Sequence, residues 1–424
     1  MKINKTQFYR TVFTLVLLMQ MYLPSFKVNV FFQLSVLFLY FILEKPTVSI
    51  RLLKIILPII FVFLLGFLGT IIYQNPILFV LKDVFHFIKP LQGILIGYFF
   101  FKTINNEKLF VKTIVQIALL SAIIHFFIII LFVDLNSGDV HAIREFTRDN
   151  FLELVAIFFL GYHKRFFNEE LFNSKNKSRL IFTILFISCI LYFSRTMIVG
   201  ALILFSSVKG YTRITQKSIK IITIAIFGVF ILYGYLYSVK IDRSKPGLEA
   251  FLYKVKIAPE ELFQTKIDRD NHKELWDHWR GYESKRAFAL MDDKPLSYLS
   301  GTGYGSLVNL KFKAPLAGDN KGMKFISELH NGYPYVLYKT GMVGLILYLA
   351  FLFGLYKIVY SKPTFETIFI SGLGVFYLFT TLTITGIYNT SDTTVFVLGA
   401  LIYGLTNITK RHHYDKENFP KSII

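Results

Sequence analysis

One histidine stands where a polar stretch of the chain gives way to an apolar one. His330-Asn331 is followed by an aromatic turn that contains Tyr333, and then by a long apolar run. Histidine has a pKa near neutrality, so its side chain can orient or deprotonate a sugar hydroxyl. Asn331 and Tyr333 are candidates for binding the substrate beside it. The alternative role for His330 is that of an interfacial histidine whose hydrogen bonds are satisfied by the protein.

Arginines at a few positions could hold a pyrophosphate near this histidine. Arg195 lies in the tight hairpin LYFSRTMIVG, whereas Arg280 and Arg286 lie in a long polar segment. A guanidinium group binds phosphate oxygens through paired hydrogen bonds and stays charged at any relevant pH. We expect Arg195 and Arg280 to act with His330 and to lower its pKa, with Arg286 as the reserve choice for binding substrate. Anchoring at the membrane interface is the alternative role for Arg195.

A third group of ionisable residues falls inside an apolar segment. Lys82, His86 and Lys89 recur at i, i+4 and i+7 in the sequence LKDVFHFIKPLQG, with Asp83 alongside. Residues at this spacing share one face of a helix. Ionisable groups within a membrane span face a protein interior or an aqueous cavity, which makes Lys82 and His86 candidates for binding substrate. Alternatively, the span starts later and these residues lie at the outer interface.

A short loop between two apolar segments adds Arg144 and Arg148. Basic residues on this side of the chain indicate an anion to bind, so Arg144 is a further candidate for substrate binding. The alternative is ordinary pairing with Glu145, Asp149 or Glu153.

Metal and thiol chemistry find no support in the sequence. No His, Cys, Asp and Glu cluster has metal-ligand spacing, so we expect neither a metal nor a cofactor. The single cysteine, Cys189, lies in an apolar segment. The long polar segment therefore has no disulfide to stabilise it.

Apolar runs dominate the chain of 424 residues, which is 54% hydrophobic and has a mean hydropathy of +0.51. Runs of about 18 to 25 apolar residues are long enough to cross a bilayer. We predict about twelve spans, of which the first lacks a cleavage site and is not a removed signal peptide. The spans lie near residues 8–24, 28–43, 55–73, 84–101, 109–133, 150–162, 180–194, 196–208, 221–238, 331–356, 365–386 and 393–408.

Basic residues predict the orientation of these spans. Lys and Arg concentrate in both tails and in alternate short loops, and the opposite short loops carry only Lys27, Arg144, Arg148 and Arg195. The positive-inside rule then places both termini in the cytoplasm and the long segment 239–329 on the opposite side of the membrane. The net charge of +20 is mainly this topology signal, and scattered basic residues disfavour nucleic-acid binding.

The predicted fold is an all-α polytopic membrane protein with one large extracytoplasmic helical loop between spans 9 and 10. We divide the chain into a membrane domain at 1–238, the outer loop at 239–329, further spans at 330–408 and a cytoplasmic tail at 409–424. Helices are expected over 247–292, where Leu275, Trp279 and Tyr282 recur at helical spacing and could lie on the membrane domain. The sequence SGTGYGS is expected to be a flexible glycine turn.

These motifs together resemble those of the O-antigen polymerase and ligase family of lipid-linked glycan transferases. The residues that carry the resemblance are His330-Asn331-x-Tyr333, Gly341-x-x-Gly344, Arg280, Gly301-x-Gly303 and Ser194-Arg195. We expect positions 334, 337, 341 and 344 to continue the His330 face of a helix, with the two glycines admitting a neighbouring helix. The sequence departs from the family at Lys339, where a glutamate is frequent. Lys339 would lie on the opposite helix face, about 13 Å along the axis, and either pair within the bundle or face another substrate group.

The resemblance implies transfer of a glycan from polyprenyl pyrophosphate to an acceptor hydroxyl on the outer face of a bacterial cytoplasmic membrane. We predict a polymerase of surface polysaccharide, whose acceptor is another lipid-linked repeat unit and whose partners include a chain-length regulator and a flippase. A ligase that transfers the glycan to lipid A–core is the first alternative. A transporter or flippase of lipid-linked sugars, which would also carry ionisable residues within its spans, is the second.

Overall fold

The computed structural model describes residues 4–133, 149–167, 170–243, 245, 247–264, 266–268, 271–314 and 322–418. Arg144 and Arg148, which the sequence analysis placed in an outer loop, lie outside these residues. The predicted role of Arg144 in substrate binding therefore stays a prediction.

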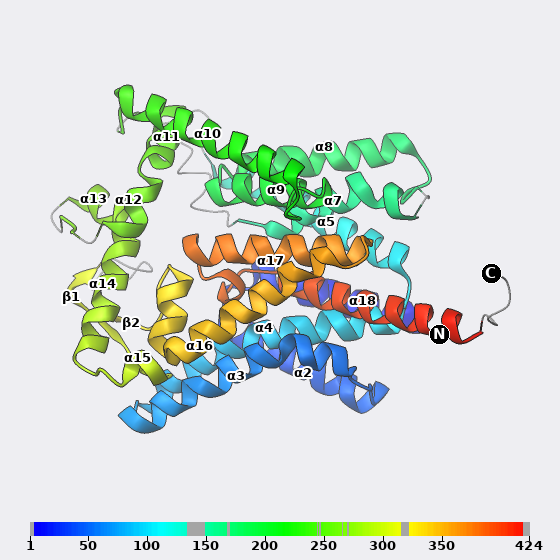
Figure 1. Ribbon diagram of the computed structural model, residues 1–424, viewed down its shortest axis with the longest axis horizontal. Helices are drawn as coiled ribbons and strands as arrows, with labels where there is room; N and C mark the ends of the chain where they lie inside the picture. The colour runs from blue at the N-terminus through cyan, green and yellow to red at the C-terminus, as the bar shows by residue number, and fades with distance from the viewer. Residues whose placement is uncertain are drawn as a thin grey trace.

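Each of the twelve segments predicted to span the membrane forms a helix (Figure 1). The twelve helices are α1 (Lys5–Tyr22), α2 (Phe26–Glu44), α3 (Ile50–Tyr73), α4 (Ile77–Ile104), α5 (Glu107–Phe132), α7 (Phe151–Phe167), α8 (Lys175–Leu191), α9 (Arg195–Val208), α10 (Gln216–Ser238), α16 (Gly332–Lys357), α17 (Phe365–Thr383) and α18 (Thr394–Asn418). Two single 3₁₀ turns, η2 (Ile358–Tyr360) and η3 (Gly386–Tyr388), flank α17.

Seven of the described helices are long and apolar enough to cross a membrane, namely α2, α3, α4, α5, α10, α16 and α17. Helix α9 and the apolar part of α18 are shorter. The chain is therefore an integral membrane protein, since helices of this length and apolarity satisfy their own backbone hydrogen bonds in lipid. The twelve predicted segments are helical and seven of the described helices have membrane-crossing length, while the number of spans stays a prediction.

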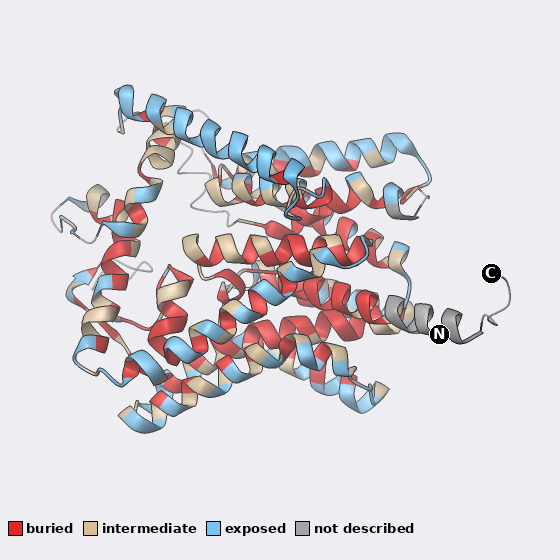
Figure 2. Ribbon diagram, viewed as in Figure 1, coloured by how far each residue is buried: buried red, intermediate tan, exposed pale blue. Residues whose placement is uncertain are grey.

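The centre of the bundle is the contact between α4 and α18. Gly97 of α4 lies against the carbonyl of Phe396, and Gly399 of α18 lies against the carbonyl of Ile94. Small residues at such positions let two backbones approach closely, which replaces the hydrophobic driving force that is missing in lipid. Figure 2 shows burial concentrated in these central helices, whereas α10 is exposed along almost its whole length.

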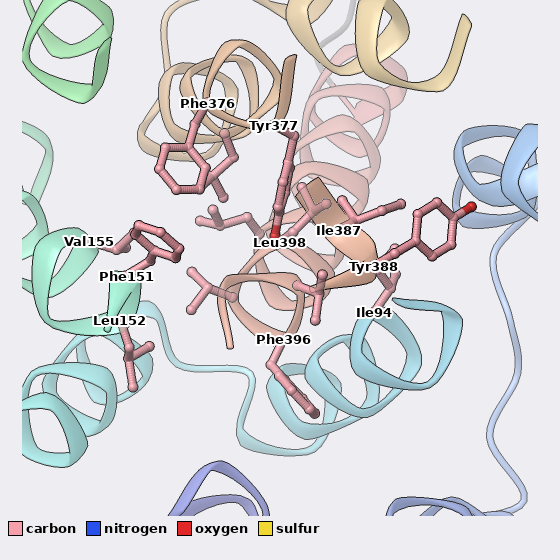
Figure 3. Packing of buried hydrophobic residues seen from close by; sticks show 14 of the residues in the cluster. Ile94, Phe151, Leu152, Val155, Phe376, Tyr377, Ile387, Tyr388, Phe396 and Leu398 are labelled. Carbon is pink, nitrogen blue, oxygen red and sulfur yellow. The ribbon is translucent and has the colours of Figure 1, made fainter. Parts of the chain in front are cut away.

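Aromatic residues from neighbouring helices complete this core. Figure 3 shows Phe151 of α7 beside Phe376 of α17, with ring centroids 5.0 Å apart. Tyr388 of η3 packs on Phe87 of α4 at a centroid distance of 4.5 Å. The segment between α17 and α18 is thereby held inside the bundle.

The polar segment lies at one end of the bundle, and both chain termini lie at the other (Figure 1). It contains α11 (Leu248–Lys256), α12 (Ala258–Phe263), α13 (His272–Asp277), α14 (Trp279–Asp292) and α15 (Ser297–Ser300). Helix α12 has proline in its first turn, and the side chain of Asn271 accepts a hydrogen bond from Glu274 N at 3.3 Å. These features confirm the helices predicted over 247–292.

A small two-stranded antiparallel sheet lies in the outer segment of a fold whose described residues are otherwise all-α, as predicted. Strand β1 (Val308–Ala314) pairs with β2 (Met323–Ile326), with Val308 opposite Ile326. Val308, Leu310 and Ala314 are buried, and the residues between Val308 and Leu310 and between Leu310 and Ala314 are more exposed. Alternation of this kind is the mark of a half-buried strand, so the sequence did contain the signal.

Strands β1 and β2 also affect the packing of the apolar stripe of the outer helices, which consists of Leu275, Trp279 and Tyr282. Leu275, Trp279 and Tyr282 are buried as predicted, but Tyr282 donates its hydroxyl proton to Leu310 O of β1 at 2.5 Å. The ring centroids of Trp279 and Phe312 lie 6.4 Å apart. The stripe therefore packs on β1, and α14 also contacts α16 of the membrane domain, so the expectation that the stripe could lie on the membrane domain stays a prediction.

The glycine-rich turn is held firmly, which contradicts the expectation of flexibility. Gly301, Gly303 and Gly305 all have positive φ, and the side chain of Tyr304 between them is buried against Gly66 of α3. Tyr304 N donates to Gly66 O at 3.1 Å, and Gly303 N donates to Lys339 O at 3.1 Å. Glycine is required here because only its backbone fits both the left-handed conformation and the close approach to α3 and α16.

Candidate active site

His330 lies just before α16, at the end of the bundle that carries the outer segment. Asn331 caps the helix, and its Oδ1 accepts a hydrogen bond from Tyr333 N at 3.2 Å. Gly332 N donates to Ile384 O at 3.0 Å, so the start of α16 is tied to the end of α17. The backbone of His330 is thus fixed while 56% of its side chain remains exposed.

A buried glutamate from the outer segment orients the His330 ring. Nδ1 of His330 lies 3.0 Å from Oε1 of Glu283, and the backbone N–H of His330 donates to Oε2 at 2.9 Å. The side chain of Glu283 is only 1% exposed. A carboxylate accepts hydrogen bonds only, so Nδ1 carries a proton and Nε2 is left for a substrate. The sequence analysis missed Glu283.

The same contact changes the expected titration of His330. The negative charge of Glu283 raises the pKa of His330, and the hydrogen bond to Glu283 and the charge of Glu328 add to this effect. Burial and the positive charge of Arg280 act in the opposite direction. Arg280 thus lowers the pKa as predicted, but the net effect is a raised pKa because of Glu283, which the sequence analysis did not include. The carboxylate lies in direct contact with the ring and outweighs the guanidinium group.

Arg195 and Arg280 converge on one carboxylate, that of Glu261 in α12. Nη2 of Arg195 lies 3.1 Å from both carboxylate oxygens, and Nη1 of Arg280 lies 2.6 Å from Oε2. Arg195 also donates to the backbone carbonyl of Lys254 in α11. Both arginine side chains keep about a quarter of their surface exposed. The cluster has two positive charges and one negative charge, so it can still attract an anion.

Helix α14 joins the arginines to the histidine. Arg280 and Glu283 are three residues apart in this helix, and residues at this spacing are neighbours on one face. Glu261 therefore holds the arginine end of the site, and Glu283 holds the histidine end. Arg195, Arg280 and His330 are thus linked through Glu261, Glu283 and α14, and their catalytic roles stay predictions.

Residues 180–349 match the family model described as O-antigen ligase. The matched segment runs from α8 into α16 and includes Arg195, Arg280 and His330. This match supports the resemblance of the chain to the O-antigen polymerase and ligase family. No curated protein and no solved structure matches the chain.

Lys339, where the family often has a glutamate, has a partner in the structure. Nζ of Lys339 lies 2.6 Å from Oδ2 of Asp83 in α4, and both side chains are fully buried. Asp83 also accepts from Gly305 N at 2.7 Å, and Lys339 donates to Ser306 O at 2.7 Å. Of the two roles left open for Lys339, the structure shows pairing within the bundle. The pair ties α4, α16 and the glycine-rich turn together.

The predicted continuous stripe along α16 is interrupted. Gly341 has φ 70° and ψ −176°, which breaks the helix, and its backbone lies against Leu299 and Gly301. The space beside Gly344 is taken by Thr340 of its own helix. Gly341 therefore accommodates a kink and admits the short helix α15, whereas Gly344 faces its own helix, so the expectation that the glycines admit a neighbouring helix is met at Gly341 only.

Lys82 and His86 of α4 reach the segment just before His330. Nε2 of His86 lies 2.9 Å and Nζ of Lys82 lies 3.5 Å from Oε1 of Glu328. Burial alone would raise the pKa of Glu328, but the hydrogen bond from His86 and the charges of His86 and Lys82 lower it to about 2. Asp83, His86 and Lys89 are buried, which agrees with the interpretation that this span turns its ionisable residues toward the protein interior.

The other predicted substrate-binding residues have structural partners. Nε of Arg286 donates to Asn309 O in β1 at 2.9 Å, and the hydroxyl of Tyr333 donates to Leu378 O in α17 at 2.7 Å. Asn331 serves as the helix cap described above. Their binding roles stay predictions. Among the described residues, no group of three His, Cys, Asp or Glu side chains could hold a metal ion.

Proposed function

We propose that this protein is a polymerase of surface polysaccharide. It transfers a growing glycan from polyprenyl pyrophosphate to a hydroxyl of an incoming lipid-linked repeat unit. The observation that carries the proposal is the connected group in which Glu283 orients His330 and Glu261 holds Arg195 and Arg280. The group combines a proton acceptor with two donors for phosphate oxygens, which are the two needs of this reaction.

The geometry supports a single displacement. The acceptor oxygen attacks the anomeric carbon of the donor, and the bond from that carbon to the pyrophosphate oxygen breaks. Nε2 of His330 takes the proton of the acceptor hydroxyl, while Glu283 stabilises the imidazolium that forms. Arg195 and Arg280 stabilise the charge on the departing pyrophosphate. One displacement inverts the anomeric configuration, and no metal or cofactor enters the proposal.

We further propose that the reaction takes place on the outer face of a bacterial cytoplasmic membrane. The positive-inside pattern of the basic residues supports this orientation, with both termini in the cytoplasm. The segment 239–329 then forms an outer domain between two membrane domains at 1–238 and 330–408. A flippase that delivers the lipid-linked repeats and a chain-length regulator are the partners that such a polymerase requires.

A ligase remains the second candidate, because the matching family model is described as O-antigen ligase. In a ligase the same three residues would act in the same way, and the acceptor would be lipid A–core. The two functions therefore differ in the acceptor and share the donor chemistry.

Purified protein in detergent tests the proposal with polyprenyl-pyrophosphate-linked repeat units as donor and acceptor. We expect a ladder of longer lipid-linked products that persists in EDTA and is absent with the His330→Ala variant. A parallel reaction with lipid A–core as acceptor should give no product. Transfer to lipid A–core without any ladder would replace the polymerase by the ligase. No transfer to either acceptor would contradict both candidates.

A further inference from the structure

A polar cavity lies near the arginine cluster, at the same end of the bundle. It has a volume of about 330 Å³, within the range of small-molecule sites. It opens among the C-terminal ends of α1, α5 and α8, the start of α7 and the loop before α18. The polar residues that line it are Tyr22, His125, Asp149, Asn150, Tyr192 and Ser391.

The cavity is coupled to the proposed pyrophosphate site through one short contact. Ser194 Oγ donates to Oδ2 of Asp149, a lining residue, at 2.7 Å. Ser194 is also the N-cap of α9, and Arg195 is the first residue of that helix. A ligand in the cavity would therefore lie close to the arginine that we assign to the donor.

The inner wall of the cavity holds a buried polar atom that has no partner. His125 is 2% exposed and lies about two helical turns, or about 10 Å, inside the end of α5. Its ring stacks on Tyr192 with centroids 3.9 Å apart, and its Nδ1 lies 2.8 Å from Ser188 Oγ. Nε2 of His125 has no hydrogen-bond partner among the described residues. A buried polar atom without a partner is costly, so a ligand group is expected to bind it.

The hydrogen-bond chain behind His125 shows which kind of group fits. Ser188 donates its hydroxyl proton to Oε2 of Glu153 at 2.5 Å. A hydroxyl has one proton, so Ser188 accepts at its contact with His125. Nδ1 of His125 then carries the ring proton, and Nε2 is an acceptor that requires a donor such as a hydroxyl.

The described residues that line the cavity favour a neutral ligand over an anion. These residues include Asp149 and contain no lysine or arginine. Tyr22, Tyr192 and Asn150 also line the cavity, and the ring of Tyr192 stacks on that of His125. Aromatic surface combined with a few fixed polar groups is the usual composition of a site for a small polar ligand.

We propose that this cavity is a binding site for a neutral sugar residue of the glycan substrate, with a sugar hydroxyl donating to His125 Nε2. The proposal rests on the proposed function for the origin of the sugar. Sugar binding itself requires no transfer reaction. The sugar belongs either to the donor glycan or to the acceptor repeat unit, and the experiments below separate these two sources.

Binding is measured by saturation-transfer NMR on the purified full-length protein. The probes are N-acetylglucosamine, galactose and rhamnose, with glucuronic acid and inorganic phosphate as anionic probes. At least one neutral sugar should bind more strongly than both anions. Ser391→Phe, which fills the rim of the cavity, and His125→Phe, which keeps the ring but removes the acceptor, should each weaken binding at least about tenfold.

Ser361→Phe is the matched control, because Ser361 is an exposed loop serine between η2 and α17. It should bind the sugars like the wild type, and so should Arg195→Lys. Equal binding by Ser391→Phe and Ser361→Phe, or preferred binding of an anion, would overturn the proposal. Sugar binding that persists when no transfer is found would contradict the proposed function alone.

The transfer assay assigns the source of the sugar. If Ser391→Phe raises the KM for the donor only, the site binds a sugar of the donor glycan. If it raises the KM for the acceptor only, the site binds the incoming repeat unit. Unchanged KM values for both substrates would remove the cavity from the reaction.

Discussion

Nδ1 of His330 lies 3.0 Å from a glutamate side chain that is 1% exposed, whereas the histidine side chain is 56% exposed. Because of this difference in exposure, Glu283 and His330 have different roles. The buried carboxylate fixes the ring and favours its protonated form, and the exposed edge of the ring faces the substrate. The pair resembles in principle the base and orienting acid of a hydrolase, although the reaction proposed here is glycan transfer.

Replacement of Glu283 by Gln should shift the pH profile of glycan transfer. The proposed base is neutral imidazole, so activity falls as the pH drops through the pKa of His330, which Glu283 raises. Removing the carboxylate lowers this pKa, and the acid limb of kcat/KM should move to lower pH. The plateau should fall at least about tenfold because the ring loses its orientation.

Glu249→Gln is the control for this pH measurement, because Glu249 forms a surface pair with Lys245 at 3.3 Å. Its profile should match that of the wild type. An acid limb at the same pH in Glu283→Gln and in the wild type would show that His330 is not the titrating base.

Arg195→Lys and Arg280→Lys should each lower the rate of glycan transfer about a hundredfold. Each substitution keeps the positive charge but loses the planar fork that binds two phosphate oxygens. The loss should appear in kcat/KM for the lipid-linked donor, measured with the detergent-solubilised protein. Arg243→Lys is the matched control, since Arg243 pairs with Asp277 at 2.7 Å elsewhere in the outer segment. Full activity of both test variants would assign these arginines a structural role.

At the scale of elements, α4 and α14 position the histidine from two sides. Helix α14 provides Glu283, and α4 provides His86 for Glu328 and Asp83 for Lys339. The glycine-rich turn fills the space between α3 and α16. The residues from 328 to 339 are therefore held by contacts on several sides, which is the support that a preorganised site requires.

Gly341→Ala should destabilise the protein, and Gly354→Ala should not. Gly341 has a φ of 70°, and a Cβ there would clash with the backbone of Leu299 and Gly301. The strained conformation alone costs about 1–3 kcal/mol, and the clash adds to this. A Cβ at Gly354 in the same helix would meet no atom within 4 Å. Thermal unfolding in detergent compares the two variants, and equal midpoints would contradict the role assigned to the kink.

At the scale of the whole molecule, the chain separates its polar outer segment from its termini. The outer segment lies at one end of the bundle, and the N- and C-terminal ends lie at the other (Figure 1). Helix α10 is the least buried of the candidate membrane spans. It runs along the bundle from a basic loop to the outer segment, where Tyr237 donates to Glu260 at 2.9 Å.

Reporter fusions should place the two ends of the bundle in different compartments. A reporter fused near Lys266 should report the extracytoplasmic side, and one fused after Arg411 should report the cytoplasm. The physical reason is the retention of Lys- and Arg-rich loops on the cytoplasmic side. A periplasmic phosphatase and a cytoplasmic fluorescent protein make the comparison. Both reporters on one side would contradict the proposed topology and the proposed position of the site.

The sequence alone determined the positions of the helices and the ends of the candidate site. Hydropathy and helical spacing are local properties, so twelve apolar segments could be predicted from adjacent residues. His330 and Arg195 were predicted from their places at changes between polar and apolar sequence, and Arg280 from its place in the outer segment and from the family resemblance. The alternation in Val308–Ala314 was also readable, although it was missed.

Only the tertiary structure decided which acidic residue meets which basic one. Glu283 lies 47 positions from His330, Glu261 lies 66 from Arg195, and Asp83 lies 256 from Lys339. Contacts over such separations depend on how helices pack, and no local periodicity contains that information. The same holds for the sign of the His330 pKa shift and for the packed glycine-rich turn. Both follow from neighbours that α14, α3 and α16 bring together in space.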